Sequence, residues 1–333
     1  MLTSGGNQTR KWGFPPMTTG RAKLRAVPAR AIEWPTIALT VCIYGGWLGI
    51  TYFHSILPWW LVCACGAWLV AWQGSLQHEV LHGHPTRWRS FNRLLALPAL
   101  SLWLPYECYR VSHLRHHRDE RLTDPLDDPE SFYWTMGLWN GLNRLWHPIL
   151  RAQTTLAGRL ILGPAWIVPR FLIKQVDALR RGDRVAWRAW RSHIVPLALS
   201  LVWLLLVCRM NFAFYLFGIV YPATSLMLLR SFAEHRAASE VYERTAIVEN
   251  APVLGLLYLY NNLHAAHHEC PVLPWYEIPA WYRANRDRLV RANGGLVYDG
   301  YLEVARRFLL QPHDGLLHPS DRAPSRRVVA VAD

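Results

Sequence analysis

Residues 57–82 have the sequence LPWWLVCACGAWLVAWQGSLQHEVLH, in which an uncharged apolar run leads into a pair of histidines. An uncharged run of about 20 residues is long enough to cross the hydrocarbon layer of a membrane as a helix. His78 and His82 are four residues apart and share one face of such a helix. The stretch therefore predicts a membrane-spanning helix over 57–76 that continues into two candidate metal ligands.

Two further histidine clusters lie far from the first along the chain, His113-Leu-Arg-His116-His117 and His264-Ala-Ala-His267-His268. Spacings of three and four residues place these imidazoles on one face of a helix. Histidines scattered over a polar surface would not repeat an H-x-x-H-H pattern. Eight clustered histidines exceed the three or four protein ligands of a zinc site and are enough for two metal ions with open positions. Because imidazole binds iron, zinc, copper and nickel, the histidines alone do not name the metal.

Other apolar blocks predict more membrane-spanning helices. The chain has 333 residues, is 52% hydrophobic and carries 18 Trp. Residues 35–53 are uncharged, and Arg209 is the only charge within 194–229. That second block would form about 54 Å of helix, too long for one crossing of a ~30 Å layer. Arg209 divides it naturally, so we expect four transmembrane helices in two hairpins. Their expected ranges are about 35–53, 57–76, 194–208 and 211–229.

The distribution of basic residues predicts the orientation. The first 30 residues hold six basic residues and no acidic one, whereas the short loops at the other ends of the spans hold only Arg209. By the positive-inside bias, both termini and the segment 77–193 are cytoplasmic. All three histidine clusters then lie just beyond span ends on the cytoplasmic side. The predicted fold is an all-α integral membrane protein whose cytoplasmic helical cap holds the metal site.

The remaining segments complete the predicted organisation. Tryptophan and arginine alternate with apolar residues over 134–190, a pattern typical of helices that lie along a membrane surface. We expect disordered polar tails over 1–30 and 312–333, with a single domain over 31–311 between them.

The net charge of +13 points to the membrane rather than to nucleic acid. The basic residues flank the predicted spans and lie among tryptophans, where they suit anionic lipid headgroups and an acidic redox partner. No nucleic-acid partner is expected. Only three of the 36 basic residues are lysine, a bias typical of GC-rich bacterial genes. This favours the bacterial inner membrane as the location.

Two alternative functions start from the same residues. His78-Glu79-Val-Leu-His82 fits H-E-x-x-H, in which two histidines bind zinc and the glutamate is the general base of a metalloprotease. At the end of a span it could mark an intramembrane protease, but that hypothesis leaves the other two clusters unexplained. A metal-ion transporter would need ionisable residues inside the spans, and these spans have almost none.

The three clusters, in this order around two membrane hairpins, resemble the histidine boxes of the membrane fatty acid desaturase superfamily. The resemblance covers roughly residues 33–285. It implies a non-haem di-iron oxidoreductase that uses O2, reduced to water, and two donated electrons to act on an unactivated C–H bond. The product is a double bond, a hydroxyl or a ketone.

The resemblance also implies the ligands. Family members add a lone histidine between the last span and the third box, a place that His235 fills. The implied iron ligands are His78, His82, His113, His116, His117, His235, His264, His267 and His268. Candidates to orient these imidazoles from behind are Glu79, Asp124, Asp128, Glu234, Asn261, Asn262 and Glu269. For Asp124 and Asp128 a capped turn is an equally good interpretation. We expect His84 either to support the ligands from behind or to have a structural role, and no ligand role for His54, His313 and His318.

The resemblance is less informative about the substrate. The strings His82-Gly-His84-Pro85-Thr86-Arg87 and Pro274-Trp275-Tyr276-Glu-Ile-Pro279 are similar to a bacterial branch that includes the desaturase of rhizobitoxine biosynthesis. We expect a desaturase that acts on a fatty acyl chain. A hydroxylase or ketolase of a lipid or carotenoid, and a desaturase of a small amino-acid-derived metabolite, are the alternatives. No cytochrome module is present, so a separate ferredoxin- or rubredoxin-type protein is the expected electron donor.

Overall fold

A computed structural model describes residues 32–117 and 121–319 of the chain. These residues are mostly helical, with one short parallel pair of strands, β1 (Ile247–Val248) and β2 (Val297–Tyr298). The predicted all-α class is confirmed. The predicted tail 1–30 lies outside the described residues, as does 320–333.

Long helices form the centre of the molecule. They are α1 (Trp34–Tyr52), α2 (Trp59–Leu81), α7 (Leu156–Arg180), α8 (Arg184–Leu201) and α10 (Tyr221–Glu234). A π-helical turn, Val202–Val207, prolongs α8, and another, Tyr215–Val220, joins α9 (Phe212–Phe214) to α10. The shorter helices are α3 (Arg89–Ala96), α4 (Tyr106–His116), α5 (Met136–Gly141), α6 (His147–Ala152), α11 (Pro252–Leu257), α12 (His264–Glu269), α13 (Ile278–Ala292) and α14 (Tyr301–Phe308).

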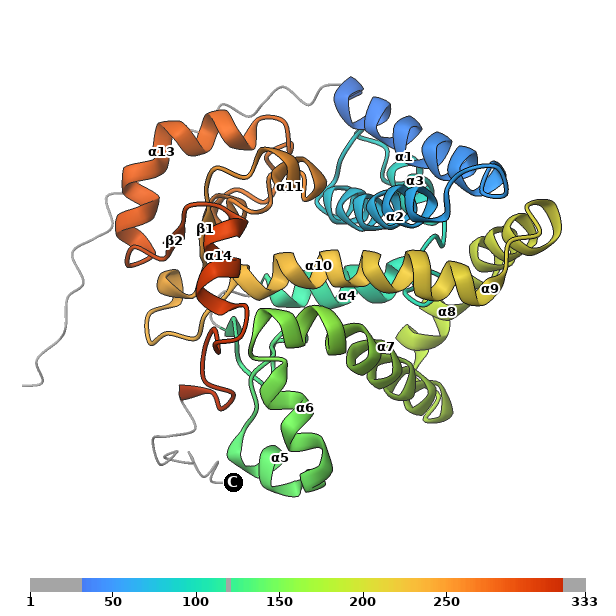
Figure 1. Ribbon diagram of the computed structural model, residues 1–333. Helices are drawn as coiled ribbons and strands as arrows, with labels where there is room; N and C mark the ends of the chain where they lie inside the picture. The colour runs from blue at the N-terminus through green and yellow to red at the C-terminus, as the bar shows by residue number, and fades with distance from the viewer. Residues whose placement is uncertain (1–31, 118–120, 320–333) are drawn as a thin grey trace, which may run out of the picture.

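Helix α10 is the central element (Figure 1). It packs against α2 on one side and against α7 on the other, and α1 packs against α2. Helix α4 packs against α8 and α2, and the segment from α11 to α14 gathers at the C-terminal end of α10 (Figure 1). The layers therefore bring the last turns of α2, α4 and α10 toward the C-terminal third of the chain.

Local sequence explains where these helices begin and end. Helix α2 starts after Pro58 and ends at His82, because Gly83 takes a φ of +109° that favours glycine. The Asp183 carboxylate caps α8 by accepting from the backbone N–H of Val185 and Ala186, at 2.7 and 3.1 Å. The chain turns at Arg209, whose φ is +52°, before α9 begins. Histidines that follow a helix end are thus fixed by the signal that ends the helix.

Within residues 32–117 and 121–319, four helices are long and apolar enough to cross a membrane, judged by length and composition. They are Trp34–Tyr52, Leu156–Arg180, Arg184–Val207 and Phe212–Glu234. This set differs in one member from the predicted one. Helix α2 is 23 residues long, but its tryptophans and Gln73 lower its mean hydropathy. Helix α7 takes its place, although the sequence predicted surface-lying helices in that region.

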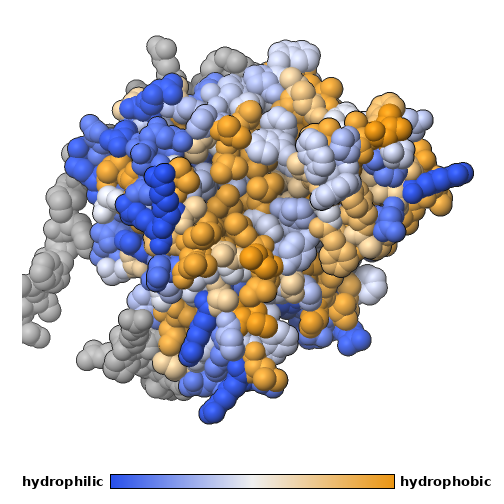
Figure 2. Space-filling view, viewed as in Figure 1, coloured by the Kyte–Doolittle hydropathy of each residue, from blue (hydrophilic) through white to orange (hydrophobic). Residues whose placement is uncertain are grey.

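The surface of these helices is apolar. Leu199 and Leu206, on α8 and the turn that prolongs it, are 65% and 70% exposed. Figure 2 shows hydrophobic residues gathered over the middle of one face, with hydrophilic residues around α13 and α14. An exposed apolar surface of this extent suits contact with lipid.

The C-terminal segment departs from the prediction of a disordered tail over 312–333. Residues 312–319 are ordered against the loop before α5, where the backbone N–H of Trp134 donates to the Leu316 carbonyl at 2.9 Å. His318 is buried and its Nε2 lies 3.2 Å from the Thr123 hydroxyl. The polar composition of this segment predicted a disordered tail. Backbone hydrogen bonds hold it instead, and such bonds cannot be recognised from a hydrophobic pattern in the sequence. The folded domain extends to residue 319.

Candidate metal centre

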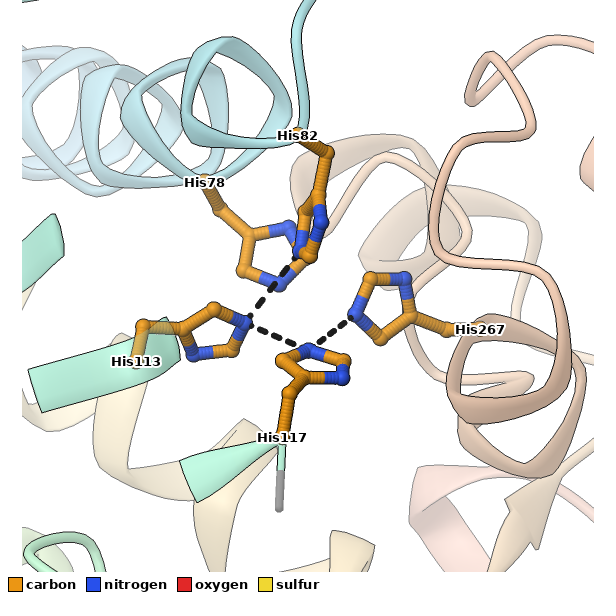
Figure 3. Close-up of side chains that lie close together, drawn as sticks. All are labelled: His78, His82, His113, His117 and His267. Atoms are coloured by element: carbon orange, nitrogen blue, oxygen red, sulfur yellow. Dashed lines mark hydrogen bonds between the residues drawn. The ribbon is translucent and has the colours of Figure 1, made fainter. Parts of the chain in front are cut away.

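The structure brings all nine predicted ligand histidines into two neighbouring groups. The first group joins α2, α4 and α12, and its members are His78, His82, His113, His117 and His267. Their side chains point toward a common centre (Figure 3). The His113 Nε2 atom lies 3.3 Å from Nε2 of His82 and 2.8 Å from that of His117. Nε2 of His117 lies in turn 3.0 Å from Nε2 of His267.

The second group joins α4, the end of α10 and α12. Its members are His116, His235, His264 and His268. Nε2 of His235 lies 3.0 Å from Nε2 of His116 and 2.9 Å from that of His264. His235 follows the last residue of α10 in extended conformation and forms an antiparallel bridge with Thr245, which turns its ring toward the group. Each H-x-x-H-H cluster divides its histidines between the two groups.

The distances within both groups fit bound metal ions. Consecutive Nε2 atoms are 2.8–3.3 Å apart. Nitrogen ligands at about 2.0–2.1 Å from one ion lie roughly 2.9–3.4 Å from each other in octahedral or tetrahedral arrangements. Neutral imidazoles that turn several lone pairs toward one point repel each other unless a cation occupies it. The convergence is therefore the arrangement expected of two metal sites.

The other ring nitrogen supports this interpretation. Nδ1 of His116 lies 2.9 and 3.1 Å from the two carboxylate oxygens of Asp128. Nδ1 of His113 lies 3.2 Å from Oε1 of Glu130, and Nδ1 of His235 lies 3.1 Å from the Arg244 carbonyl. An imidazole whose Nδ1–H donates to an oxygen behind it presents the Nε2 lone pair forward, as a metal ligand does.

Burial keeps most of these imidazoles neutral. His235, His264 and His267 are buried among other histidines, and loss of solvation holds the pKa of each well below its usual value. His116 differs: burial lowers its pKa, but Glu130 and Asp128 outweigh that effect and raise it to about 9. Because a metal binds neutral imidazole, the first three are ready to bind without releasing a proton.

A comparison with known families agrees with this geometry. The family model described as fatty acid desaturase matches residues 54–300, which include all three histidine clusters and His235. The chain belongs to the fatty acid desaturase family. No individual curated protein matches the chain. Members of this family are membrane oxidoreductases. The apolar helices and the two histidine groups of this chain agree with that assignment.

The predicted supporting residues of this desaturase-family site have different outcomes. Asp128 and Glu234 contact the histidines: Oε1 of Glu234 lies 3.4 Å from Nδ1 of His264. Asn261 also does, since its Oδ1 lies 3.2 Å from the same nitrogen. Asp124 instead accepts from the backbone N–H of Leu126 and Asp127, as a turn cap does.

Three other predicted supporting residues have partners outside the two histidine groups. The Asn262 side chain donates to the Val248 carbonyl at 2.7 Å, and Glu269 forms an ion pair with Arg288. Glu79 accepts from the backbone N–H of Trp275 at 2.9 Å. These contacts join the side chains to the loops and helices around α12, and that they orient ligand imidazoles stays a prediction.

Glu79 belongs to a third, smaller group with Glu33 and His84. Nδ1 of His84 lies 2.7 Å from Oε1 of Glu33, and its Nε2 lies 3.9 Å from Oε1 of Glu79. A metalloprotease of the H-E-x-x-H type needs its glutamate beside the metal-bound water. Because Glu79 is turned to Trp275 and His84, the geometry opposes the protease alternative. His84 thus contacts Glu33 and Glu79 and lies outside the two histidine groups.

The sequence did not reveal two charged residues of the site. Glu130 stands behind His113, and the only signal was its place in the acidic string Asp127-Asp128-Pro-Glu130. Arg230 is buried on α10, where its Nε lies 2.9 Å from Oε1 of Glu234. Its signal was a basic residue one helical turn before Glu234 in an otherwise apolar helix. The remaining predicted non-ligands, His54, His313 and His318, lie outside both groups.

Proposed function

We propose that the protein is a membrane-bound di-iron desaturase that introduces a double bond into a fatty acyl chain. The observation that carries the proposal is the convergence of nine histidines into groups of five and four within the matched family region. The all-nitrogen ligand set suits iron and leaves positions open for O2. Bound there, two iron ions would supply the reduction of O2 to water and the oxidation of an unactivated C–H bond.

The residues of this chain hold the imidazole rings in place and exclude water from the site. His113 is fully buried, and His116, His264 and His267 are each no more than 3% exposed. The carboxylates of Asp128 and Glu130 hold the rings of His116 and His113 in one tautomer. A site that excludes water protects a reactive oxidant from side reactions. Electrons would come from a separate ferredoxin- or rubredoxin-type protein, for which the basic net charge favours an acidic partner.

The arrangement of the helices supports a topology of two hairpins. Ile32 pairs with Thr86, so the start of α1 lies beside the end of α2. An even number of crossings must therefore separate them, and since α1 is a candidate span, α2 crosses as well. Its lower hydropathy is compatible with this role, because α2 packs between α1 and α10 and lipid covers less of it.

The same reasoning assigns α7 to the membrane surface. His117 and His235 lie on one side, since Nε2 atoms of both clusters meet in the two groups. The helix ending at Val207 and the one ending at Glu234 provide two crossings between them. A third crossing by α7 would put the clusters on opposite sides. With the basic N-terminal segment inside, the site is cytoplasmic, in what we propose is a bacterial inner membrane.

Mass spectrometry of lipids tests the reaction. The chain is expressed in a bacterial host together with a ferredoxin and its reductase, and the acyl chains are compared with those of a host carrying His113→Ala. Desaturation predicts acyl products that have lost two hydrogens. Products that have gained one oxygen, with no loss of hydrogen, would show that the reaction is a hydroxylation and not a desaturation.

A further inference from the structure

A cavity borders the second histidine group. Its volume is about 70 Å³, and its wall includes His235 and Glu234 at one part and Arg159 at another. Arg159 lies in the first turn of α7, and only 6% of it is exposed. The cavity therefore brings a buried guanidinium into the same small space as a candidate metal ligand.

The position of Arg159 is determined by its surroundings. Its Nε donates to the Gln153 carbonyl at 2.9 Å, and its guanidinium carbon lies 3.6 Å from the centre of the Phe132 ring. The preceding residue must be glycine, since a Cβ on Gly158 would lie 1.9 Å from the Ala152 carbonyl oxygen. The start of α7 is thus pressed against α6, and the guanidinium is held in one place.

Arg159 lacks the anionic partner that a buried cation requires. Its Nη1 is buried and has no hydrogen-bond partner among the described residues. No carboxylate of the described residues forms an ion pair with it, although four acidic side chains line the same cavity. An unpaired charge in such a site is costly unless a ligand completes it.

The four acidic residues are already engaged. Asp128 and Glu130 contact His116 and His113, and Glu234 pairs with Arg230. Asp314 accepts from the Tyr133 hydroxyl at 2.5 Å. The acidic side chains face their own partners, and Arg159 is the charged group on the wall for which none is found in the described part of the chain.

We propose that Arg159 binds the carboxylate of the substrate, so that the enzyme acts on a free carboxylic acid rather than on an ester or thioester. A monoanion fits better than a phosphate dianion, because the acidic side chains of the wall repel the second charge. The cavity is small and reaches both Arg159 and His235. This inference rests on the proposed function, since it names the substrate class of that site.

Paired ligands of equal shape test the assignment. Iron-loaded full-length protein in detergent is titrated with hexanoate and with hexanamide, and the apparent Kd comes from the concentration dependence of the melting temperature. We expect hexanoate to bind at least about tenfold more tightly. Arg159→Gln should weaken hexanoate about 10- to 100-fold and leave hexanamide unchanged, because a hydrogen-bonded charge pair is lost. Arg151→Gln, which removes an exposed arginine on α6, should leave both affinities unchanged.

Three results would overturn the assignment. Equal affinity of the wild-type protein for hexanoate and hexanamide would mean that no carboxylate site exists. A preference for hexanoate that survives Arg159→Gln would mean that the acid binds the metal directly. Tighter, Arg159-dependent binding of hexyl phosphate would assign the site to a phosphate headgroup. Arg159→Lys keeps the charge and should retain the preference, which provides a second test if the glutamine variant does not fold.

The readout also separates this inference from the proposed function. Binding is measured without turnover, and iron is counted in every sample. Protein that holds no iron but still binds hexanoate through Arg159 would refute the di-iron proposal alone. Protein that holds two iron ions and shows no Arg159-dependent preference would refute the carboxylate proposal alone.

Discussion

At the scale of single residues, the site is defined by which nitrogen of each imidazole faces inward. Nε2 atoms of the imidazoles other than that of His78 lie close to one another within each group. Nδ1 atoms of His113, His116 and His235 contact oxygen atoms behind the rings. This division of roles makes individual side chains testable, because a ligand and its supporting acid affect metal binding to different degrees.

His235 is the ligand candidate with the least sequence support, and its removal is informative. His235→Ala leaves three histidines in the second group, so we expect loss of one of two bound iron ions and of desaturation. Iron content and product formation measure this outcome. His54→Ala, at a histidine outside both groups, is the control. A variant with full iron and full activity would show that His235 is not a ligand.

Asp128 and Asp124 make a matched pair. Asp128→Asn removes the charge behind His116 and should reduce metal affinity about 10- to 100-fold. Asp124→Asn changes a turn cap that accepts only from backbone N–H groups, so metal affinity should not change. Titration of the metal-free variants with Fe²⁺ compares the two. Equal effects would mean that Asp128 acts through the turn and not through His116.

The pH dependence follows from the buried neutral histidines. The pKa of His235, His264 and His267 is lowered in the folded protein, so the unfolded chain binds more protons below pH 6.5. The free energy of unfolding of metal-free protein should therefore fall as the pH drops from about 7.5 to about 5.5. Each such histidine contributes up to about 1.4 kcal/mol per pH unit.

His116 has a pKa raised to about 9 and opposes this trend. Its contribution to the free energy of unfolding is complete below pH 6.5 and is lost as the pH rises through 9. Thermal unfolding across this range is the measurement, and greater stability at the acidic end would contradict it.

Sequence spacing was sufficient for the histidines and insufficient for their partners. The periods of three and four residues mark His113, His116 and His117 as one helix face, and the structure places them on α4 and at its end. Asp124 and Asp128 look alike in the sequence, yet only one reaches a ring. The difference depends on how the chain folds back after α4, which local spacing does not encode.

At the scale of elements, helix ends position the chemistry. Gly83 ends α2 directly after His82, and the extended backbone of His235 ends α10 at the second group. Apolar composition identified both ends of α1 to within one residue, but the predicted span 211–229 stops five residues before the helix Phe212–Glu234 ends. Helix α7 lies where the sequence predicted surface-lying helices, yet it also has the length and hydropathy of a membrane span. Hydropathy does not separate these two positions, and the shared histidine groups favour the surface.

The close contact between α6 and the start of α7 can be tested by substitution of Gly158. Gly158→Ala would drive a methyl group into the Ala152 carbonyl, and backbone cannot give way as a side chain can. We expect a loss of about 1–3 kcal/mol in the free energy of unfolding, together with displacement of Arg159. Gly141→Ala, where an added Cβ meets nothing within 4 Å, is the control. Equal melting temperatures for the two variants would show that the contact is not tight.

At the scale of the whole molecule, the histidine groups impose the topology. Clusters from before and after the second hairpin meet at one place. In the proposed topology the C-terminal ends of α2 and α10 therefore lie on the same side of the membrane as α4 and α12. The sequence predicted this from the count of spans and from the charge of the N-terminal segment. The structure reaches the same four-helix number with a different fourth candidate, and the parity of crossings supports α2 over α7.

Labelling of introduced cysteines checks this topology. Arg209→Cys lies at the turn before α9, and Asp287→Cys lies on an exposed part of α13. In intact bacterial cells, a membrane-impermeant maleimide should label the first and should reach the second only after permeabilisation. The parent chain with its native cysteines is the background control. Labelling of Asp287→Cys in intact cells would reverse the proposed orientation.

The metal content of the purified protein tests the di-iron centre most directly. Protein produced in iron-supplemented medium and purified without chelators should contain two iron ions per chain, and the ratio should fall when histidines of either group are replaced. One zinc ion per chain, with no iron, would contradict the proposed chemistry.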